Sequence, residues 1–379
     1  MSTRDMARWL YDYEQGSSAH ESGSLANRSC RRWQRPWEHI MNRRTFLAAG
    51  LGSSLARDVS RKLRIGVLGA VYAHAEEKIP VLGESPDWDL IGVCEEDDQV
   101  RRQYSASGVR ILSQADLLSE CDAVAVESDV TEHARHGKLV LEAGKHLHLE
   151  KPPATDFAGL QNLVDLARTK GLLLQIGYMW RYHPGINRAI QAAQLGWLGD
   201  IYMVRGTINN QLPARRRPEW ERFQGGIMFE LGSHLIDAVV RLMGAPRAVR
   251  PVLQAHDASR DGLADNTVAV LEYDRALAVI CASTLQPNSR NHRNFEILGT
   301  RGTALVQPLE PSELVMDLEG AAGPYPAGVT RVELPPYRRY VDDLADFARA
   351  IRNGSSLPVS LEQELTVQRT LLRCTGKEP

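Results

Sequence analysis

Cysteine is scarce in this chain of 379 residues: the five cysteines are scattered, and no two of them stand in a CxxC pair. An odd, scattered set gives neither a disulfide framework nor the ligand spacing of a zinc site, so no metal is expected. The sequence also lacks an apolar run of roughly 18 residues, which excludes an ordinary membrane-spanning helix. Its formal net charge of −2 shows no basic excess, which argues against nucleic acid as a partner.

The N-terminal region differs in composition from the rest of the chain. Residues 1–40 are rich in Arg, Ser, Trp and Glu and show no sustained periodicity, so we predict a disordered extension; an upstream extension of the reading frame, with Met41 as the initiator, is the alternative. From Met41 onward, Arg43 and Arg44 precede a short, weakly apolar run, and residues 54–56 offer a small-residue cleavage site. This pattern resembles a twin-arginine export signal and predicts a periplasmic or otherwise exported protein; a fortuitous arginine pair in a cytoplasmic protein is the alternative.

Beyond residue 60, short apolar strands alternate with amphipathic helices. The expected strands are residues 62–69, 90–95, 109–112, 123–127, 146–150 and 172–178. The expected helices are residues 74–82, 131–143 and 157–169. Alternation of this kind predicts a parallel sheet with helices on both faces, and therefore an α/β domain over residues 61–183.

The pattern changes after Pro184. The expected strands, mostly antiparallel, are residues 201–207, 252–256, 267–273, 276–284, 294–298 and 303–307. The expected helices are residues 186–195, 228–243, 340–351 and 361–372. Residues 184–379 are therefore predicted to form a second, α+β domain, whose terminal helices could pack back on the first domain. Residues 1–60, the extension and signal, lie outside both domains.

A glycine-rich turn, residues 66–74 (GVLGAVYAH), follows the first expected strand and leads into a helix. Backbone N–H groups in such a turn, together with the helix dipole, can hold a pyrophosphate. The second glycine of the dinucleotide fingerprint falls on Val71 and the third is absent, so an ordinary strand–helix connection is the alternative. The candidate cofactor contacts here are Gly66, Gly69, Ala70, Val71 and His74.

The second expected strand ends in Glu95, another candidate cofactor contact. A carboxylate at this position bonds the ribose hydroxyls of the adenosine and repels a 2′-phosphate, which favours NAD over NADP. Arg101 and Arg102 follow nearby and keep NADP open, although two arginines on a solvated helix face are the plainer interpretation.

Residues 146–153 (HLHLEKPP) place Lys151 at the carboxyl end of a buried parallel strand, the edge at which open α/β sheets bind their ligands. A lysine buried beside a cofactor can act as a general acid or base, or it can anchor a phosphate or a hydroxyl group. A solvated lysine at the end of a strand is the alternative. Glu150, which precedes Lys151, is a further candidate cofactor contact.

A second cluster lies at residues 225–237 (GGIMFELGSHLID), on the helix expected from residue 228. Glu230 and His234 are four residues apart and Asp237 follows three later, so the three share one helix face. A carboxylate and an imidazole near a lysine suit proton transfer at a hydroxyl group; a helix with a satisfied structural histidine is the alternative. No third ligand is evident that would make this a metal site.

Arg181 and Tyr182 follow the last expected strand of the first domain. The arginine could hold a nicotinamide carboxamide, a phosphate or a substrate oxygen, and a salt bridge at the domain hinge is the equally weighted alternative. The arginine run at residues 215–217 is interpreted as a solvated loop.

From about Lys62 to the final helix, the chain resembles the glucose–fructose oxidoreductase / inositol dehydrogenase / rhizopine-catabolism (Gfo/Idh/MocA) family. Three motifs carry the resemblance: the turn at residues 66–74, the segment from Gly144 through Pro152, and the cluster at residues 225–237. The resemblance implies an α/β Rossmann domain with a parallel sheet, followed by an α+β domain with a large, open, mostly antiparallel sheet. It also implies that the second sheet forms a homodimer or homotetramer.

The resemblance further implies an NAD(P)-dependent oxidoreductase that transfers a hydride at a hydroxyl carbon of a sugar, cyclitol or sugar derivative. The family's aspartate, four residues before its histidine, is Glu230 here. The expected catalytic residues are Lys151, His234 and Glu230. The expected cofactor contacts also include Glu150, Lys151 and Arg181, and the expected substrate contacts are Lys151, Arg181, Tyr182, His234 and Asp237.

Two other functions stay open on the sequence alone. Some relatives are redox-cycling glycosidases, which use tightly held NAD to oxidise a sugar transiently, eliminate the aglycone and re-reduce the product. Other relatives are non-catalytic regulators that bind a nucleotide. The expected partner is a small carbohydrate-like molecule.

Overall fold

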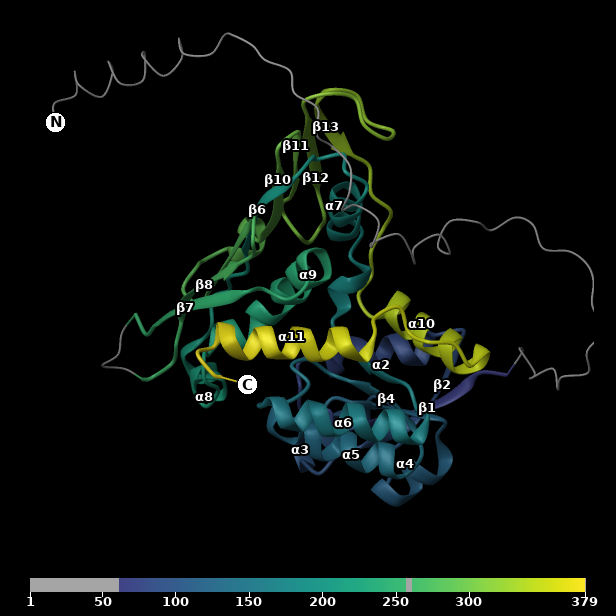
Figure 1. Cartoon of the computed structure of the whole chain (residues 1–379). Coiled ribbons are helices and arrows are strands. Elements are labelled where there is room, and N and C mark those ends of the chain that lie inside the picture. The colour runs from purple at the N-terminus through teal and green to yellow at the C-terminus, as the bar shows by residue number, and fades with distance from the viewer. Residues whose placement is uncertain (1–60, 257–260, 379) are drawn as a thin grey trace, which may run out of the picture. The chain divides into compact units, whose positions relative to one another are not determined.

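The computed structural model describes residues 61–256 and 261–378 (Figure 1). The predicted extension and twin-arginine signal, residues 1–60, lie outside these described residues. Within the described ranges, no helix is long and apolar enough to cross a membrane.

Five parallel strands form the first sheet, in the order β2-β1-β3-β4-β5. They are β1 (Leu63–Leu68), β2 (Trp88–Cys94), β3 (Ala123–Val126), β4 (His146–Leu149) and β5 (Leu174–Ile176). The helices are α2 (Ala75–Glu84), α3 (Asp98–Ala106), α4 (Gln114–Glu120), α5 (His133–Glu142) and α6 (Phe157–Lys170). The strand order reverses between β1 and β3, and a sheet of this kind binds its ligand outside the carboxyl ends of those strands.

Eight strands form the second sheet, in the order β13-β12-β11-β10-β6-β9-β8-β7. They are β6 (Ile201–Thr207), β7 (Ala248–Gln254), β8 (Asn266–Glu272), β9 (Leu277–Ser283), β10 (Asn294–Gly299), β11 (Gly302–Val306), β12 (Leu314–Leu318) and β13 (Gly328–Val332). Neighbouring strands are antiparallel except β6 and β9, and α7 (Pro184–Gln194) and α9 (Ser233–Met243) pack on the sheet. The expected fold class, an α/β Rossmann domain followed by a mostly antiparallel α+β domain, is confirmed.

The last two helices, α10 (Val341–Asn353) and α11 (Leu361–Cys374), return to the first domain (Figure 1). Trp88 in β2 donates a hydrogen bond of 2.9 Å from its indole N–H to the carbonyl of Leu344 in α10. α11 packs against both α6 and α9, so it joins the two domains. The proposed domain boundary, between residues 183 and 184, falls between η2 (Met179–Tyr182) and α7.

Three features of the local structure differ from expectation. Residues 109–112 add only a single bridge, from Ile111 to Val93 at the edge of β2, because too few residues pair to make a strand. The short strands β12 and β13 were not expected. The arginine run at residues 215–217 is solvated only in part: Arg215 is exposed and Arg216 partly exposed, but Arg217 begins α8 (Arg217–Glu221) and its guanidinium is buried in ion pairs with two aspartates.

Candidate active site

Lys151 lies just beyond β4, at the carboxyl edge of the parallel sheet, and its side chain is completely buried. Its ammonium group donates hydrogen bonds to the hydroxyl of Tyr72 at 2.7 Å, and to the carbonyl and the carboxylate of Glu230, both at 3.1 Å. An ammonium group has three N–H donors, so all of them are used. The turn after β1, the end of β4 and the segment before α9 therefore meet at this lysine.

Glu230 comes from η4 (Met228–Gly232), a short π-helical turn that runs directly into α9. Such turns occur frequently at functional sites. Gly226 starts the segment with a φ of 45°, and a Cβ there would lie 2.5 Å from a backbone carbonyl, so this position requires glycine. The carbonyl of Glu230 also accepts a hydrogen bond from the Ser233 hydroxyl at 3.0 Å, so both of its lone pairs are used.

His234 lies one helical turn beyond Glu230 and is 3% exposed. Its ring centroid is 4.9 Å from that of Trp180 and 6.2 Å from that of His74. Its Nδ1 is buried with no hydrogen-bond partner in the part of the chain that the structure describes. Burial lowers the pKa of His234 well below its usual value, and the charge of Lys151 lowers it further, so the imidazole is neutral at neutral pH.

Two side chains of the glycine-rich turn also reach this cluster. The hydroxyl of Tyr72 accepts a hydrogen bond from Lys151 and donates one to the carboxylate of Glu230. Nδ1 of His74 lies 2.9 Å from Oε1 of Glu150. Sequence reasoning assigned His74 to the cofactor and missed Tyr72. The one signal for Tyr72 was a large phenol in a turn that the dinucleotide fingerprint builds around glycine.

A second buried lysine, Lys78 in α2, lies beside the cluster and was also missed. Its ammonium group contacts Glu127 at the end of β3 and lies 2.7 Å from Oε2 of Glu150, and all three side chains are completely buried. Burial raises the pKa of Glu127 to about 8, although the charge of Lys78 opposes this shift. Burial also acts on Glu150, but the charges of Lys78 and His74 hold its pKa well below the usual value. At neutral pH, therefore, Glu150 is ionised and Glu127 keeps its proton.

The turn between β1 and α2 retains features that fit a dinucleotide. Gly69 has a φ of 73°, and a Cβ there would lie 2.5 Å from Ser128, so the position requires glycine. Among the described residues, the N–H groups of Val71 and Ala73 have no hydrogen-bond acceptor, and the side chain of Val71 is exposed. Free N–H groups at the start of a helix fit a pyrophosphate. Gly66, by contrast, lies within β1 and packs against α4, which corrects its assignment to the cofactor.

Glu95 follows β2 and its carboxylate points back to the same turn. One of its oxygens accepts a hydrogen bond from the N–H of Ala70 at 2.6 Å. The other oxygen accepts from the N–H groups of Glu96 and Asp97, at 2.7 and 2.8 Å. Because an ionised carboxylate offers about four lone-pair sites, one is left for a ribose hydroxyl.

Arg181, Tyr182 and Asp237 are engaged elsewhere, which corrects the expectation that they contact the cofactor or the substrate. The buried guanidinium of Arg181 donates to Asp237 at 2.7 and 3.0 Å, and to Glu364 in α11 at 2.6 and 2.8 Å. The hydroxyl of Tyr182 donates to Asp346 in α10 at 2.9 Å. The salt bridge that was the alternative interpretation of Arg181 is what the structure contains.

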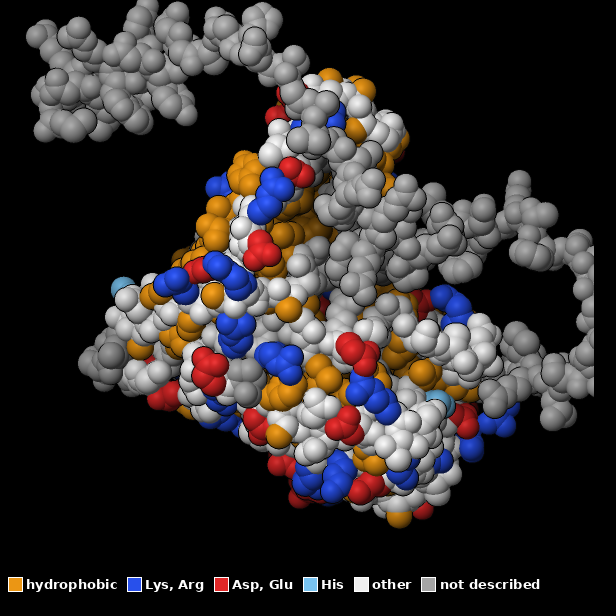
Figure 2. Space-filling model, in the orientation of Figure 1, with side chains coloured by type: hydrophobic (Ala, Val, Ile, Leu, Met, Phe, Trp, Pro, Cys, Tyr) orange, Lys and Arg blue, Asp and Glu red, His pale blue; other side chains and the backbone are white. Residues whose placement is uncertain are grey.

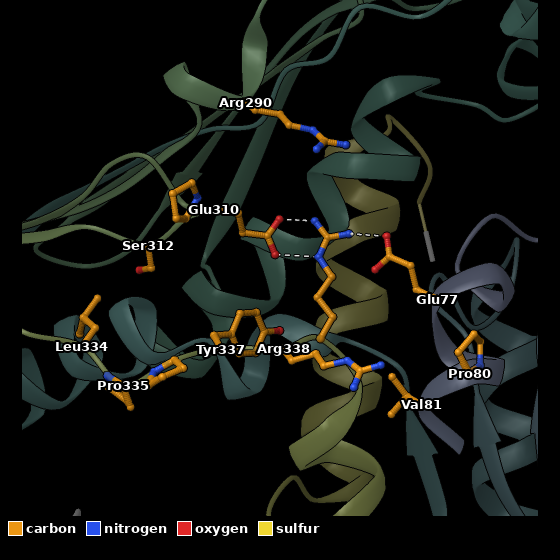
Figure 3. A pocket seen from close by; sticks show the side chains of 13 residues that line it. Glu77, Pro80, Val81, Arg290, Glu310, Ser312, Leu334, Pro335, Tyr337 and Arg338 are labelled. Carbon is orange, nitrogen blue, oxygen red and sulfur yellow. Dashed lines mark hydrogen bonds and ion pairs between the residues drawn. The ribbon is translucent and has the colours of Figure 1, made fainter. Parts of the chain in front are cut away.

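A cavity of about 710 Å³ lies next to the cluster (Figure 3). It is lined by Glu77, Pro80 and Val81 of α2, by Arg290, and by residues 310–312 and 334–339. Glu310, labelled in Figure 3, forms an ion pair with Arg339 and accepts a hydrogen bond of 3.2 Å from the indole of Trp180. The ring of Trp180 is tilted by 40° to that of His234, so Trp180 contacts both the imidazole and Glu310 in the wall of this cavity.

Two family models match most of the described chain. The model described as "Oxidoreductase family, NAD-binding Rossmann fold" matches residues 63–178. The model described as "GFO/IDH/MocA C-terminal domain" matches residues 186–305.

Individual relatives cover most of the chain at low identity. The dTDP-3,4-didehydro-2,6-dideoxy-alpha-D-glucose 3-reductase of Streptomyces violaceoruber is 25% identical, over 78% of this chain and 86% of that protein. The scyllo-inositol 2-dehydrogenase (NADP(+)) of Bacillus subtilis is 24% identical, over 82% of this chain and 92% of that protein. A solved oxidoreductase from Agrobacterium radiobacter, in complex with NAD+, L-tartaric acid and magnesium, gives a TM-score of 0.71 at 15% identity, covering 83% of this chain and 97% of that chain. At this identity, the structural likeness shows the fold.

Proposed function

Because this chain belongs to the Gfo/Idh/MocA family of oxidoreductases, we propose that it transfers a hydride at a hydroxyl carbon of a sugar, cyclitol or sugar derivative. The observation that carries the proposal is the cluster of Lys151, Glu230 and His234 at the carboxyl edge of the parallel sheet. The relatives support the substrate class, since one is named as a sugar reductase and another as an inositol dehydrogenase.

The residues of the first domain fit the NAD of this family. We assign the pyrophosphate to the free N–H groups of Val71 and Ala73, and the adenosine ribose to Glu95. Arg101 forms an ion pair with Asp98 on its own helix, which supports NAD over NADP because this guanidinium already has a partner. When bound, NAD supplies the acceptor for the hydride.

The side chains of the cluster provide the groups for acid–base catalysis. The carboxylate of Glu230 lies against the ammonium group of Lys151, and His234 presents a nitrogen without a partner in the described chain. A hydroxyl group bound at this cluster can lose its proton to one side chain while another holds its oxygen. Glu230 replaces the family's aspartate, and its carboxylate contacts both Lys151 and Tyr72.

A screen of aldoses, cyclitols and glycosides with added NAD, in which the absorbance of NADH is monitored, tests this proposal. We expect at least one compound to be oxidised with formation of an equivalent of NADH. Release of an aglycone without net NADH would instead identify a redox-cycling glycosidase. Nucleotide binding without turnover on any compound would identify a regulator and contradict the proposal.

Export and self-assembly stay predictions of the sequence. Cell fractionation tests the first, because replacing Arg43 and Arg44 by lysines should keep an exported chain in the cytoplasm. The second is supported by exposed hydrophobic residues on strands of the second sheet, which are Tyr202, Val252, Leu277 and Val329. Figure 2 shows hydrophobic side chains gathered over the region of β6 and β10. Light scattering on the purified protein would give the mass of the assembly.

A further inference from the structure

Lys151 is shielded from any substrate by its own partners. Its side chain is completely buried, and its three N–H donors are taken by Tyr72 and by two oxygens of Glu230. Tyr72 is only partly buried, and its ring centroid lies 5.2 Å from the ammonium nitrogen. The side chain of this pair that a substrate can approach is therefore the phenol, with the lysine behind it.

The hydrogen bonds of the phenol have a direction. The hydroxyl oxygen of Tyr72 accepts from Lys151, and the hydroxyl proton is donated to Oε1 of Glu230. A hydroxyl oxygen has two lone pairs, so one is left to accept a hydrogen bond from a substrate hydroxyl. A substrate in that position would complete a chain of hydrogen bonds from its own hydroxyl, through Tyr72, to the carboxylate of Glu230.

We propose that Tyr72 is the catalytic residue that exchanges a proton with the substrate hydroxyl, that Glu230 stores the proton, and that Lys151 is a positioning residue. This proposal rests on the proposed function and names the acid–base group within it. During oxidation the substrate O–H bond breaks as an O–H bond to Tyr72 forms, and the original phenolic proton moves to Glu230. The carbon-bound hydrogen leaves with its electron pair as the hydride that the oxidised dinucleotide accepts. Lys151 takes no part in the proton transfer and holds both groups by its hydrogen bonds, and reduction reverses each transfer.

The environment of Tyr72 favours a relay over a free phenolate. Burial raises the pKa of Tyr72 well above its usual value, and the charge of Glu230 raises it further, so the phenol is protonated at neutral pH. A protonated phenol can pass its proton to Glu230 as it receives another. The imidazole of His234 lies close to these groups, and its Nδ1 is buried with no partner among the described residues.

The Tyr72→Phe variant tests the relay, because it keeps the ring and removes only the hydroxyl. We expect kcat to fall by about 10²-fold or more, with a change in the pH profile and the solvent isotope effect, while the Kd for NAD changes little. Tyr273→Phe is the matched control: its hydroxyl donates only to the carbonyl of Gly244 at 3.2 Å, in the second domain, and kcat should be unchanged. Wild-type kcat and an unchanged pH profile in Tyr72→Phe would overturn the proposal while leaving the proposed function intact. No turnover by the wild type would overturn both.

Chemical labelling tests the shielding without turnover. An amine-reactive reagent should modify exposed Lys138 equally in all variants, and should modify Lys151 in Tyr72→Ala but not in the wild type. Circular dichroism would show that Tyr72→Ala is folded. Equal labelling of Lys151 in the wild type and in Tyr72→Ala would overturn the proposal, because the phenol would not then cover the lysine.

Discussion

Two buried clusters in this protein each pair a cation with at least one carboxylate, and they differ in what is left unpaired. Around Arg181, four hydrogen bonds tie the guanidinium to Asp237 and Glu364. Around Lys151, the phenol of Tyr72 is partly exposed and Nδ1 of His234 lacks a partner within the described residues. A cluster whose charged groups pair with one another joins elements of the fold, whereas a cluster with an unpaired nitrogen and a partly exposed tyrosine has capacity for a ligand. Residue type alone does not distinguish the two.

The largest expected effect is the loss of turnover in Lys151→Met. The substitution keeps much of the side-chain volume but removes the charge that holds Tyr72 and Glu230 in place, so kcat should fall by about 10³-fold. The affinity for NAD, measured by calorimetry, should be largely retained. Lys138→Met, at an exposed position in α5, is the control. A kcat close to that of the wild type would show that Lys151 has no role in the reaction and that the two clusters do not differ in function.

Arg181→Met should affect stability and leave the chemistry alone. Two buried carboxylates, Asp237 and Glu364, would lose their cation, which we expect to lower the free energy of unfolding by about 3–5 kcal/mol. Urea titration measures this change, with Arg349→Met, in an exposed ion pair on α10, as a control of little effect. A large fall in kcat for the folded variant, without loss of stability, would contradict the structural role of Arg181.

The smallest effect concerns the pH dependence of stability near Lys78. The pKa of Glu127 is about 8 in the folded protein, against an ordinary value of 4.5, so the folded chain holds a proton that the unfolded chain releases. The stability contributed by Glu127 is therefore full below the lower value and is lost as the pH rises through about 8. Glu127→Gln cannot titrate and should flatten this decline in urea titrations between these two pH values. Glu120→Gln, at an exposed site, should leave the slope unchanged, and an unchanged slope in Glu127→Gln would show that Glu127 is ionised throughout.

Local sequence patterns were enough for most of the fold. The short, mostly apolar strands β1 and β3, followed by helices, predicted the parallel sheet because strand–helix alternation buries both faces of a sheet. β12 and β13 were missed because each has only five residues, and β13 has no buried residue at all, so the apolar signal of each segment is weak. The family inferred from three motifs is confirmed by the matches to both domains.

The site was predictable only where a motif pointed to it. Lys151, Glu230 and His234 could be found because a strand end and a helix period fix where they lie. Lys78 and Tyr72 could not be found from the sequence, because their partners come from other segments and only the folded chain brings them together. The same limit explains the error at Arg181: its partner Glu364 lies in α11, and nothing in the local sequence shows that this helix returns to η2.

The account depends most directly on whether the carboxyl edge of the parallel sheet, where Lys151 lies, binds a dinucleotide. We would denature the purified full-length protein, assay the supernatant for NAD(H) and NADP(H), and titrate both oxidised dinucleotides into protein stripped of nucleotide. The account predicts released or saturably bound NAD, with weaker binding in Glu95→Ala. Failure of the folded protein to bind either dinucleotide would contradict it, and the cluster around Lys151 would then have no hydride acceptor.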